Sequence, residues 1–169
     1  MVSGIVMIVF GISRETSDFW VEGLELWWAK TRARHAGIRR LLRRLDNGTC
    51  SARNRRQWIK RLVAFADRTG LVLHLGYYPP EHSKYNPIER VWGIWEMHWK
   101  GTLLTDLATA MSWAGTMTWH GVHPQVFQIE NIYEKGVTLP DQEGEQLQAR
   151  LERSLTLPKW DVIIRPMPK

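Results

Sequence analysis

The 169-residue sequence predicts an α/β fold built on a mostly parallel sheet, and three observations support this prediction. Apolar runs rich in Ile, Val and Leu, at residues 2–12 and 71–78, are typical of buried strands. The segment 53–69 places basic residues opposite an apolar stripe, which is typical of a surface helix. Strands and helices alternate along the chain, and this order favours parallel strands joined by right-handed crossovers.

The first two elements are a strand and a helix. Residues 2–12 form the expected strand, which Gly11 and Ser13 close. A side chain among residues 16–18 can cap the following helix. Its tryptophans and leucine recur at helical spacing until the basic residues 32–35. A strand followed by an amphipathic helix is the first half of a crossover unit.

The second strand is expected at residues 38–45, ending in the turn Asp46-Asn47-Gly48. Its RRLLRR stretch is unusually charged for a central strand. The helix at 53–69 ends before Gly70, a residue type that commonly closes helices. The third strand, residues 71–78, then leads into a loop at Pro79 and Pro80.

Two further helices are expected in the second half of the chain, at residues 87–99 and 105–113. Beyond residue 125 the pattern loosens, apart from a polar helical segment near 143–153. We therefore expect one α/β domain over residues 1–125 and a helical extension over residues 126–169, because a chain of this length fits a single main core.

Composition limits the possible functions. One cysteine, Cys50, excludes an internal disulfide, a thiolate metal cluster and a redox pair, which fits a cytoplasmic protein. The apolar run 2–12 is well short of the ~20 residues that span a bilayer, so no membrane partner is expected. Ten tryptophans suit a core covered by helices or stacking surfaces for a flexible partner.

The net charge of +6 is unevenly distributed. Residues 30–61 contain twelve Lys and Arg but a single Asp. Such a block favours a polyanion such as nucleic acid, although solvated Arg side chains packed over apolar surface are an alternative. Within the block, the candidate DNA contacts are Arg53, Arg55, Arg56 and Lys60.

Two carboxylates stand where a metal site is expected. Asp46 follows a strand, and Glu89 lies in the first turn of the helix after the next strand, so both can approach one rim of a parallel sheet. Carboxylate oxygens are the ligands that Mg²⁺ and Mn²⁺ prefer. Structural roles also fit: Asp46 in a turn, and Glu89 in a capping box with Asn86 as N-cap and Pro87 at the first helical position.

Several segments, taken in order, resemble one known family. They are SRETSDFWVEGLELWW, LDNG, RLVAFADRTGLVLHLGYYPPEHSKYNPIERVWG, HWKGTLL and LERSLTLPKWDV. PPEHSKYNPIER is highly specific, whereas LDNG alone is weak. The chain resembles, over nearly its whole length, the Rhodopirellula-type DDE transposases of bacterial insertion sequences, distant relatives of the Tc1/mariner group.

The resemblance implies a ribonuclease H-like fold in which Asp46 and Glu89 are two catalytic carboxylates that bind metal. It implies cleavage and strand transfer of insertion-sequence DNA with two Mg²⁺ or Mn²⁺ ions, which activate the attacking oxygen and stabilise the leaving one. DNA ends and target DNA would be the partners, in the cytoplasm at the nucleoid. In the same loop, Lys84 would contact a phosphate and Tyr85 or His82 would pack against the DNA end.

The chain departs from the family pattern at its start. The first catalytic Asp and the N-terminal strands of the fold have no counterpart, so we expect a truncated, C-terminal part of the catalytic domain that is inactive alone. It could form a homodimer or join an intact transposase subunit. One alternative is a non-catalytic, basic DNA-binding remnant; another is an interaction protein whose tryptophans and arginines bind a protein partner.

Overall fold

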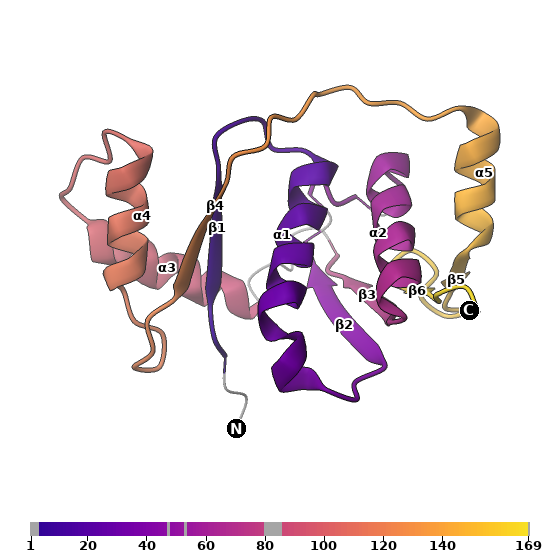
Figure 1. Ribbon diagram of the computed structural model, residues 1–169, viewed down its shortest axis with the longest axis horizontal. Helices are drawn as coiled ribbons and strands as arrows, with labels where there is room; N and C mark the ends of the chain where they lie inside the picture. Colours follow the sequence, from indigo (N-terminus) through magenta and orange to yellow (C-terminus); the bar gives the residue numbers. More distant parts are fainter. Residues whose placement is uncertain (1–3, 47, 53, 80–85, 169) are drawn as a thin grey trace. The chain divides into compact units, whose positions relative to one another are not determined.

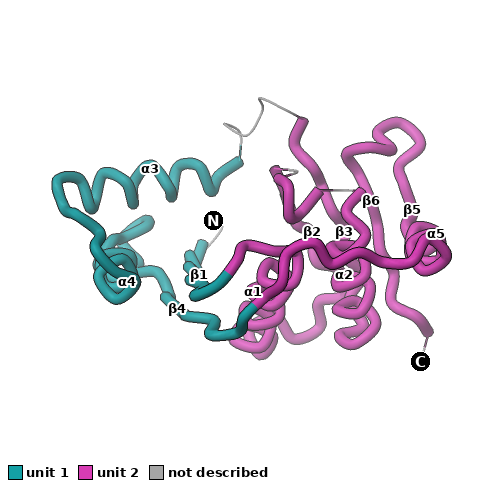
Figure 2. Tube along the Cα trace, turned by 90° about the horizontal axis from the view of Figure 1, so that it is seen from above, with its two compact units in different colours: residues 1–13, 84–132 teal, residues 14–83, 133–169 magenta. Residues whose placement is uncertain are grey.

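The structure, a computed structural model, describes residues 4–46, 48–52, 54–79 and 86–168. The chain forms two compact units (Figure 2), of which unit 1 comprises residues 1–13 and 84–132, and unit 2 comprises residues 14–83 and 133–169. Each unit therefore combines two stretches that lie far apart in the sequence. The expected boundary between residues 125 and 126 stays a prediction.

Unit 2 contains a four-stranded mixed sheet in the order β2-β3-β6-β5. Strands β2 and β3 are parallel, and β6 pairs antiparallel with both β3 and β5. Helices α1 and α2 lie side by side, and α5 packs along α2 (Figure 1). The elements are β2 (Arg40–Leu45), β3 (Val72–Tyr77), β5 (Leu151–Arg153), β6 (Asp161–Ile164), α1 (Ser17–Thr31), the 3₁₀ helix η1 (Arg32–His35), α2 (Arg56–Thr69) and α5 (Asp141–Ala149).

Local sequence signals explain where the helices of unit 2 begin and end. Thr16 caps α1, since its hydroxyl accepts a hydrogen bond from the Phe19 amide at 3.2 Å. Gly70 closes α2 in a left-handed conformation with φ 73°, which glycine adopts without strain. Its amide donates to the Ala66 carbonyl at 2.8 Å. Both expected helices are thus confirmed, but only α2 is a crossover within one sheet, since it joins the parallel strands β2 and β3. The strand before α1, β1 (Met7–Gly11), belongs to a separate two-stranded sheet, so the single parallel sheet expected from the sequence is not formed.

The core of unit 2 lies between the sheet and the α1–α2 pair. Trp58 of α2 is fully buried, and its indole N–H donates to the Tyr77 hydroxyl of β3 at 3.1 Å. This bond satisfies a polar group that burial would otherwise leave without a partner. The other buried apolar residues of this core are Val21, Leu24, Leu45, Ile59, Leu62, Val63, Phe65, Ala66, Leu71, Leu73, Leu75, Val162 and Ile164.

The charged strand β2 fits its sheet because its side chains alternate between two faces. Leu41, Arg43 and Leu45 are on the core side, whereas Arg40 and Arg44 are exposed on the other side. Burial lowers the pKa of Arg43 to about 10, partly offset by the neighbouring Tyr77. One of the four arginines in RRLLRR therefore faces the core, and β2 is an edge strand rather than a central one.

Unit 1 holds a two-stranded parallel sheet, β1-β4, with a small core of its own. Ile8, Val91, Ala114 and Met117 are its buried residues. The elements are β1 (Met7–Gly11), α3 (Pro87–Trp99), α4 (Leu107–Thr116) and β4 (Gln125–Ile129). Strand β4 corrects the sequence analysis, which found only loosened structure beyond residue 125. Its five residues, QVFQI, do not alternate cleanly between polar and apolar, and so short a segment does not stand out without its partner β1.

The C-terminal region also differs from expectation. The polar segment 143–153 is helical only as far as α5 extends, and residues 151–153 form β5. The final apolar stretch forms β6, whose antiparallel pairing with β3 makes the sheet mixed instead of purely parallel. Such pairing joins residues about 90 positions apart, which local sequence patterns do not report.

One ion pair fastens this C-terminal region to α2. The Asp67 carboxylate accepts hydrogen bonds from the Arg150 guanidinium at 2.7 and 3.2 Å, and from the Met167 amide at 2.8 Å. The bonds from Arg150 are the main cause that lowers the pKa of Asp67 below its ordinary value. Asp67 thus links α2 to the chain on both sides of the β5–β6 hairpin.

Stability should therefore depend on the charge of Asp67. Because the folded state lowers its pKa, the stabilisation is fully present above the unfolded-state pKa of about 3.9 and is lost as pH falls through the folded value. We expect Asp67→Asn to lower the free energy of unfolding at pH 7. The difference in unfolding free energy between variant and wild type should become smaller towards pH 2. Urea unfolding between pH 2 and pH 7 measures this difference. A difference that does not change with pH would contradict the stabilising role of the Asp67 charge.

Candidate active site

Asp46 directly follows β2 and is held at the end of the sheet. The carbonyl oxygen of Leu45 accepts a hydrogen bond from the Tyr78 amide at 2.7 Å, so the ends of β2 and β3 stay together. The Asp46 side chain is exposed, and its Oδ1 accepts from the Gly48 amide at 3.2 Å. This bond is the Asx turn that the DNG sequence predicts. Within the described residues Oδ2 has no hydrogen-bond partner, so one carboxylate oxygen remains available to a cation.

The loop after Asp46 is fixed to the start of α1. The hydroxyl of Ser17, which is buried, donates to the Cys50 carbonyl at 2.7 Å and accepts from Arg55 Nε at 3.2 Å. The Ser51 amide in turn donates to the Gly48 carbonyl at 3.1 Å. These contacts position the backbone beside Asp46 through buried groups, which suits a site that must hold its ligands in place.

Glu89 lies in the first turn of α3. Asn86 is the N-cap, and its side-chain oxygen accepts from the Ile88 amide at 3.5 Å, while Pro87 occupies the start of the helix. The Glu89 amide donates to the Asn86 carbonyl at 3.1 Å. Its carboxylate is exposed and makes no hydrogen bond or ion pair with any described residue. The reciprocal half of a capping box is therefore not seen, and this carboxylate too remains available.

The two carboxylates belong to different units, Asp46 to unit 2 and Glu89 to unit 1. Their convergence on one site therefore stays a prediction. In residues 4–46, 48–52, 54–79 and 86–168, no three His, Cys, Asp or Glu side chains gather closely enough to hold a metal ion. Asp46 and Glu89 nonetheless supply hard oxygen donors, which is the donor chemistry that Mg²⁺ or Mn²⁺ requires, and no cation of the described residues pairs with either carboxylate.

The candidate DNA contacts near the start of α2 differ in availability. Arg55 is exposed, although its Nε bonds Ser17. Arg56 pairs with Asp141 at 2.6 Å, and Lys60 pairs with Glu143 at 2.8 Å, both on α5. The pairs neutralise two of the cations locally, so this stretch of α2 is less positive than its sequence suggests. Arg53, His82, Lys84 and Tyr85 lie outside the residues that the structure describes.

The arginines of η1 and β2 were not among the DNA contacts predicted from the sequence. Arg32, Arg34, Arg40 and Arg44 are all exposed, and none of their side chains forms an ion pair or hydrogen bond with another described residue. Strand geometry could have revealed two of them, because side chains alternate between the two faces of a strand and residues 40 and 44 therefore fall on the same face.

Residues 1–166 match a model of one protein family, described as the Rhodopirellula transposase DDE domain. The match includes both Asp46 and Glu89 and nearly the whole chain. Two other comparisons, with curated proteins and with solved structures, found no match. Among the described helices, none has both the length and the apolar character needed to cross a bilayer.

Proposed function

Because the chain belongs to the Rhodopirellula transposase DDE domain family, we propose that it contributes Asp46 and Glu89 to the metal-binding centre of a DNA transposase. The observation that carries the proposal is that this family match includes two exposed carboxylates, one after a strand and one opening a helix, and that neither has a cationic partner among the described residues. The finer expectations, a ribonuclease H-like fold and a Tc1/mariner relationship, belong to the same proposal.

The chemistry would be cleavage and joining of phosphodiester bonds in DNA. When bound, a pair of Mg²⁺ or Mn²⁺ ions supplies activation of the attacking oxygen and stabilisation of the leaving oxygen. Asp46 and Glu89 would hold the ions. The start of α3 also favours an anion nearby, because the first amides of a helix carry partial positive charge. Glu89 would thus stand where both a cation and a DNA phosphate can be bound.

The DNA partners would be the ends of an insertion sequence and its target. Arg53, Arg55 and Lys84 would contact phosphates, and Tyr85 or His82 would pack against a DNA end. Two carboxylates, without an assigned third, should bind metal weakly, so the isolated chain should turn over little DNA. A homodimer or assembly with an intact transposase subunit would be the active context, in the cytoplasm at the nucleoid.

Iron-directed cleavage of the backbone tests whether Asp46 and Glu89 share a metal. Fe²⁺ substitutes for Mg²⁺ in carboxylate sites and, with ascorbate and peroxide, generates radicals that cut the polypeptide close to the ion. We expect cuts near residue 46 and near residue 89. Either Asp46→Asn or Glu89→Gln should remove both sets of cuts, because each substitution takes one ligand from the same site. Mass spectrometry of the fragments gives the positions.

Glu96→Gln is the matched control for Glu89→Gln, since Glu96 is an exposed glutamate on the same helix without a described partner. It should leave the cleavage pattern unchanged. If Asp46→Asn removed only the cuts near residue 46, the two carboxylates would not share an ion, and the proposed centre would be wrong. Excess Mg²⁺ should suppress all specific cuts by competition.

A further inference from the structure

The acidic side chains of unit 2 are largely committed to partners within that unit. Asp18 and Glu25 pair with Arg61, and Glu25 also pairs with Arg68. Asp67, Asp141, Glu143 and Glu152 pair with cations on α2, directly after α5 and next to β6. Since every one of these cations lies outside η1 and β2, the internal ion pairs neutralise one part of the unit and leave another positive.

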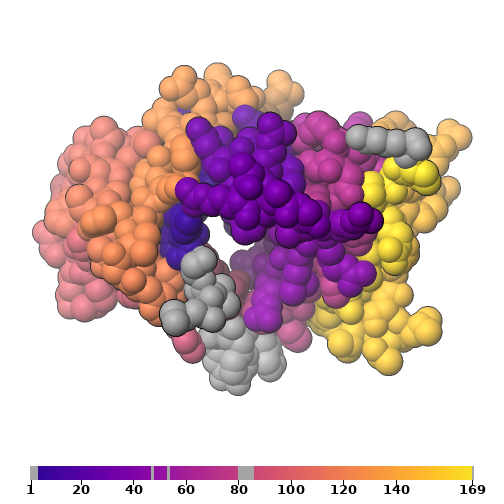
Figure 3. Space-filling model, turned by 60° about the horizontal axis from the view of Figure 1, so that its bottom comes forward, coloured from indigo at the N-terminus to yellow at the C-terminus, as the bar shows by residue number. Residues whose placement is uncertain are grey.

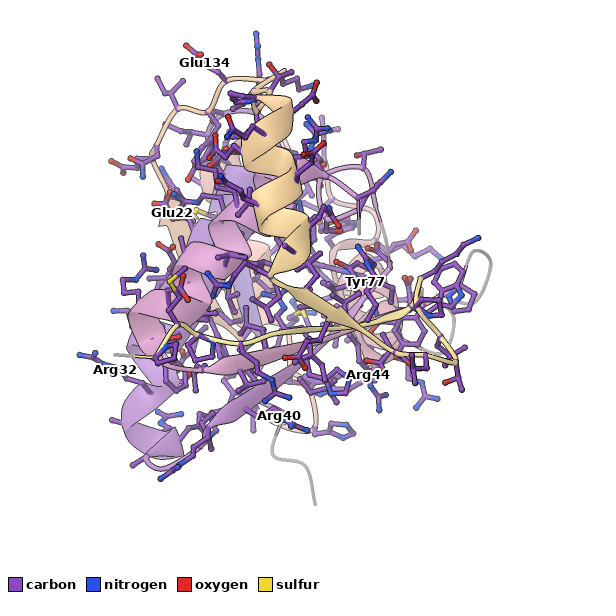
Figure 4. The ribbon with its side chains drawn as sticks, turned by 90° about the vertical axis from the view of Figure 1, so that its right-hand side faces the viewer. Glu22, Arg32, Arg40, Arg44, Tyr77 and Glu134 are labelled. Carbon is purple, nitrogen blue, oxygen red and sulfur yellow. The ribbon has the colours of Figure 1, made fainter. Side chains whose placement is uncertain are left out.

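Arg32 and Arg34 on η1 and Arg40 and Arg44 on β2 lie in the part left positive, and we name these four residues the η1–β2 arginine surface. These four side chains are exposed and form no ion pair within the described residues. In Figure 4, Arg32, Arg40 and Arg44 lie towards one end of the unit, whereas the labelled Glu22 and Glu134 lie towards the other. The space-filling view shows the purple atoms of a longer segment, which includes η1 and β2, on the face turned towards the viewer (Figure 3).

Strand geometry gives the surface a defined shape. Arg40 and Arg44 are four residues apart on one face of β2, which separates their Cα atoms by ~13 Å at the usual rise per residue. Between them, the exposed Leu42 carries no charge, and β2 is the edge strand of its sheet. Edge arginines on an open face can therefore approach an extended polyanion without a neighbouring strand in the way.

We propose that the η1–β2 arginine surface binds the phosphate backbone of duplex DNA, and that Arg56 and Lys60 do not. The proposal relies on the proposed function only for the identity of the polyanion. A guanidinium group without an ion pair can neutralise a phosphate and so release a counterion from the DNA. Arg56 and Lys60 would first have to break their ion pairs with Asp141 and Glu143. The contacts carry no base information, so this binding should not depend on DNA sequence.

The test is the salt dependence of binding to a labelled random-sequence duplex, measured without divalent metal. In wild type, the logarithm of the binding constant should fall linearly with the logarithm of salt concentration. The double variant Arg40→Gln/Arg44→Gln should reduce the magnitude of that slope by about 2, because each phosphate contact contributes ~0.9. At low salt it should also weaken binding by roughly tenfold or more.

The double variant Arg56→Gln/Lys60→Gln is the control with the same loss of charge, and it should keep the wild-type slope. Urea unfolding checks that both variants remain folded. The opposite result, with an unchanged slope for Arg40→Gln/Arg44→Gln and a reduced slope for the control, would overturn the proposal. So would polyglutamate displacing the duplex as well as unlabelled DNA does at equal charge, because the surface would then bind any polyanion.

These measurements separate the inference from the proposed metal centre. Binding without divalent metal does not require Asp46 or Glu89, and the iron-cleavage pattern does not require the arginines. If Arg40→Gln/Arg44→Gln leaves the salt slope unchanged while the iron cuts depend on both carboxylates, only the proposal that the η1–β2 arginine surface binds DNA is wrong. If the double variant reduces the slope but the iron cuts do not depend on both carboxylates, the chain binds DNA through this surface and the proposed metal centre is wrong.

Discussion

The Asp46→Asn variant should lose roughly 100-fold or more of any Mg²⁺- or Mn²⁺-dependent DNA cleavage or joining that the chain supports, alone or in a mixed assembly. An amide keeps the size of the side chain and its turn-forming oxygen, which accepts from the Gly48 amide at 3.2 Å, but it removes the negative charge that binds a cation. Turnover on duplex DNA carrying insertion-sequence ends, with and without divalent metal, measures the loss.

A control variant and a DNA-binding measurement show whether the loss of turnover comes from the missing Asp46 charge. Glu145→Gln removes an exposed carboxylate of α5 in the same unit, one without a described partner, and should leave turnover unchanged. DNA binding by Asp46→Asn should match or exceed wild type, since a negative charge has been removed. Equal turnover in Asp46→Asn and wild type would favour the alternative, a basic DNA-binding protein without catalysis of its own.

Loss of the Trp58 side chain should be the most damaging change to stability. Trp58→Ala removes a fully buried ring from the interface between α2 and the sheet, and we expect it to cost ~3–5 kcal/mol of unfolding free energy. It also leaves the Tyr77 hydroxyl without the indole that donates to it at 3.1 Å. Because a domain typically has ~5–15 kcal/mol in total, much of unit 2 should be unfolded or easily unfolded. Urea denaturation followed by circular dichroism measures the change.

Variants of the two neighbouring tyrosines distinguish the contribution of the Trp58–Tyr77 hydrogen bond from that of the buried Trp58 ring. Tyr77→Phe keeps the ring but leaves the Trp58 indole N–H without its acceptor, which should cost ~1–3 kcal/mol. Tyr78→Phe is the matched control, because the Tyr78 hydroxyl is buried and has no hydrogen-bond partner among the described residues. Its removal should be neutral or stabilising. Equal destabilisation by the two variants would contradict the assigned role of the Trp58–Tyr77 bond.

Much of the secondary structure could be predicted from sequence because its signals are local. The apolar stripe of α2, the glycine that ends it and the asparagine that caps α3 all act within a few residues. Strands β4 and β6 were missed for the opposite reason. Each is short, and the residues that it pairs with on its partner strand, β1 or β3, are 85 or more positions away in the sequence. Patterns within a window of a dozen residues do not contain that pairing.

The candidate site was also only partly predictable from the sequence. Residue type and position marked Asp46 and Glu89 as candidate ligands, and the structure adds that neither carboxylate has a cationic partner among the described residues. The DNA-contact candidates depend on more than type. Arg56 and Arg40 look equivalent in sequence, yet Asp141, 85 positions from Arg56, is bonded to it, whereas Arg40 has no described partner. Charge composition alone could not separate them.

The sequence by itself determined the family, the strands and helices with strong local signals, and the two acidic residues proposed to bind metal. Only the tertiary structure decided which cations are neutralised, which face of β2 is exposed, and that the C-terminal strand joins the sheet antiparallel. The physical reason is that ion pairs and strand pairing depend on distance in space, and folding brings together residues whose separation in the chain gives no sign of their contact.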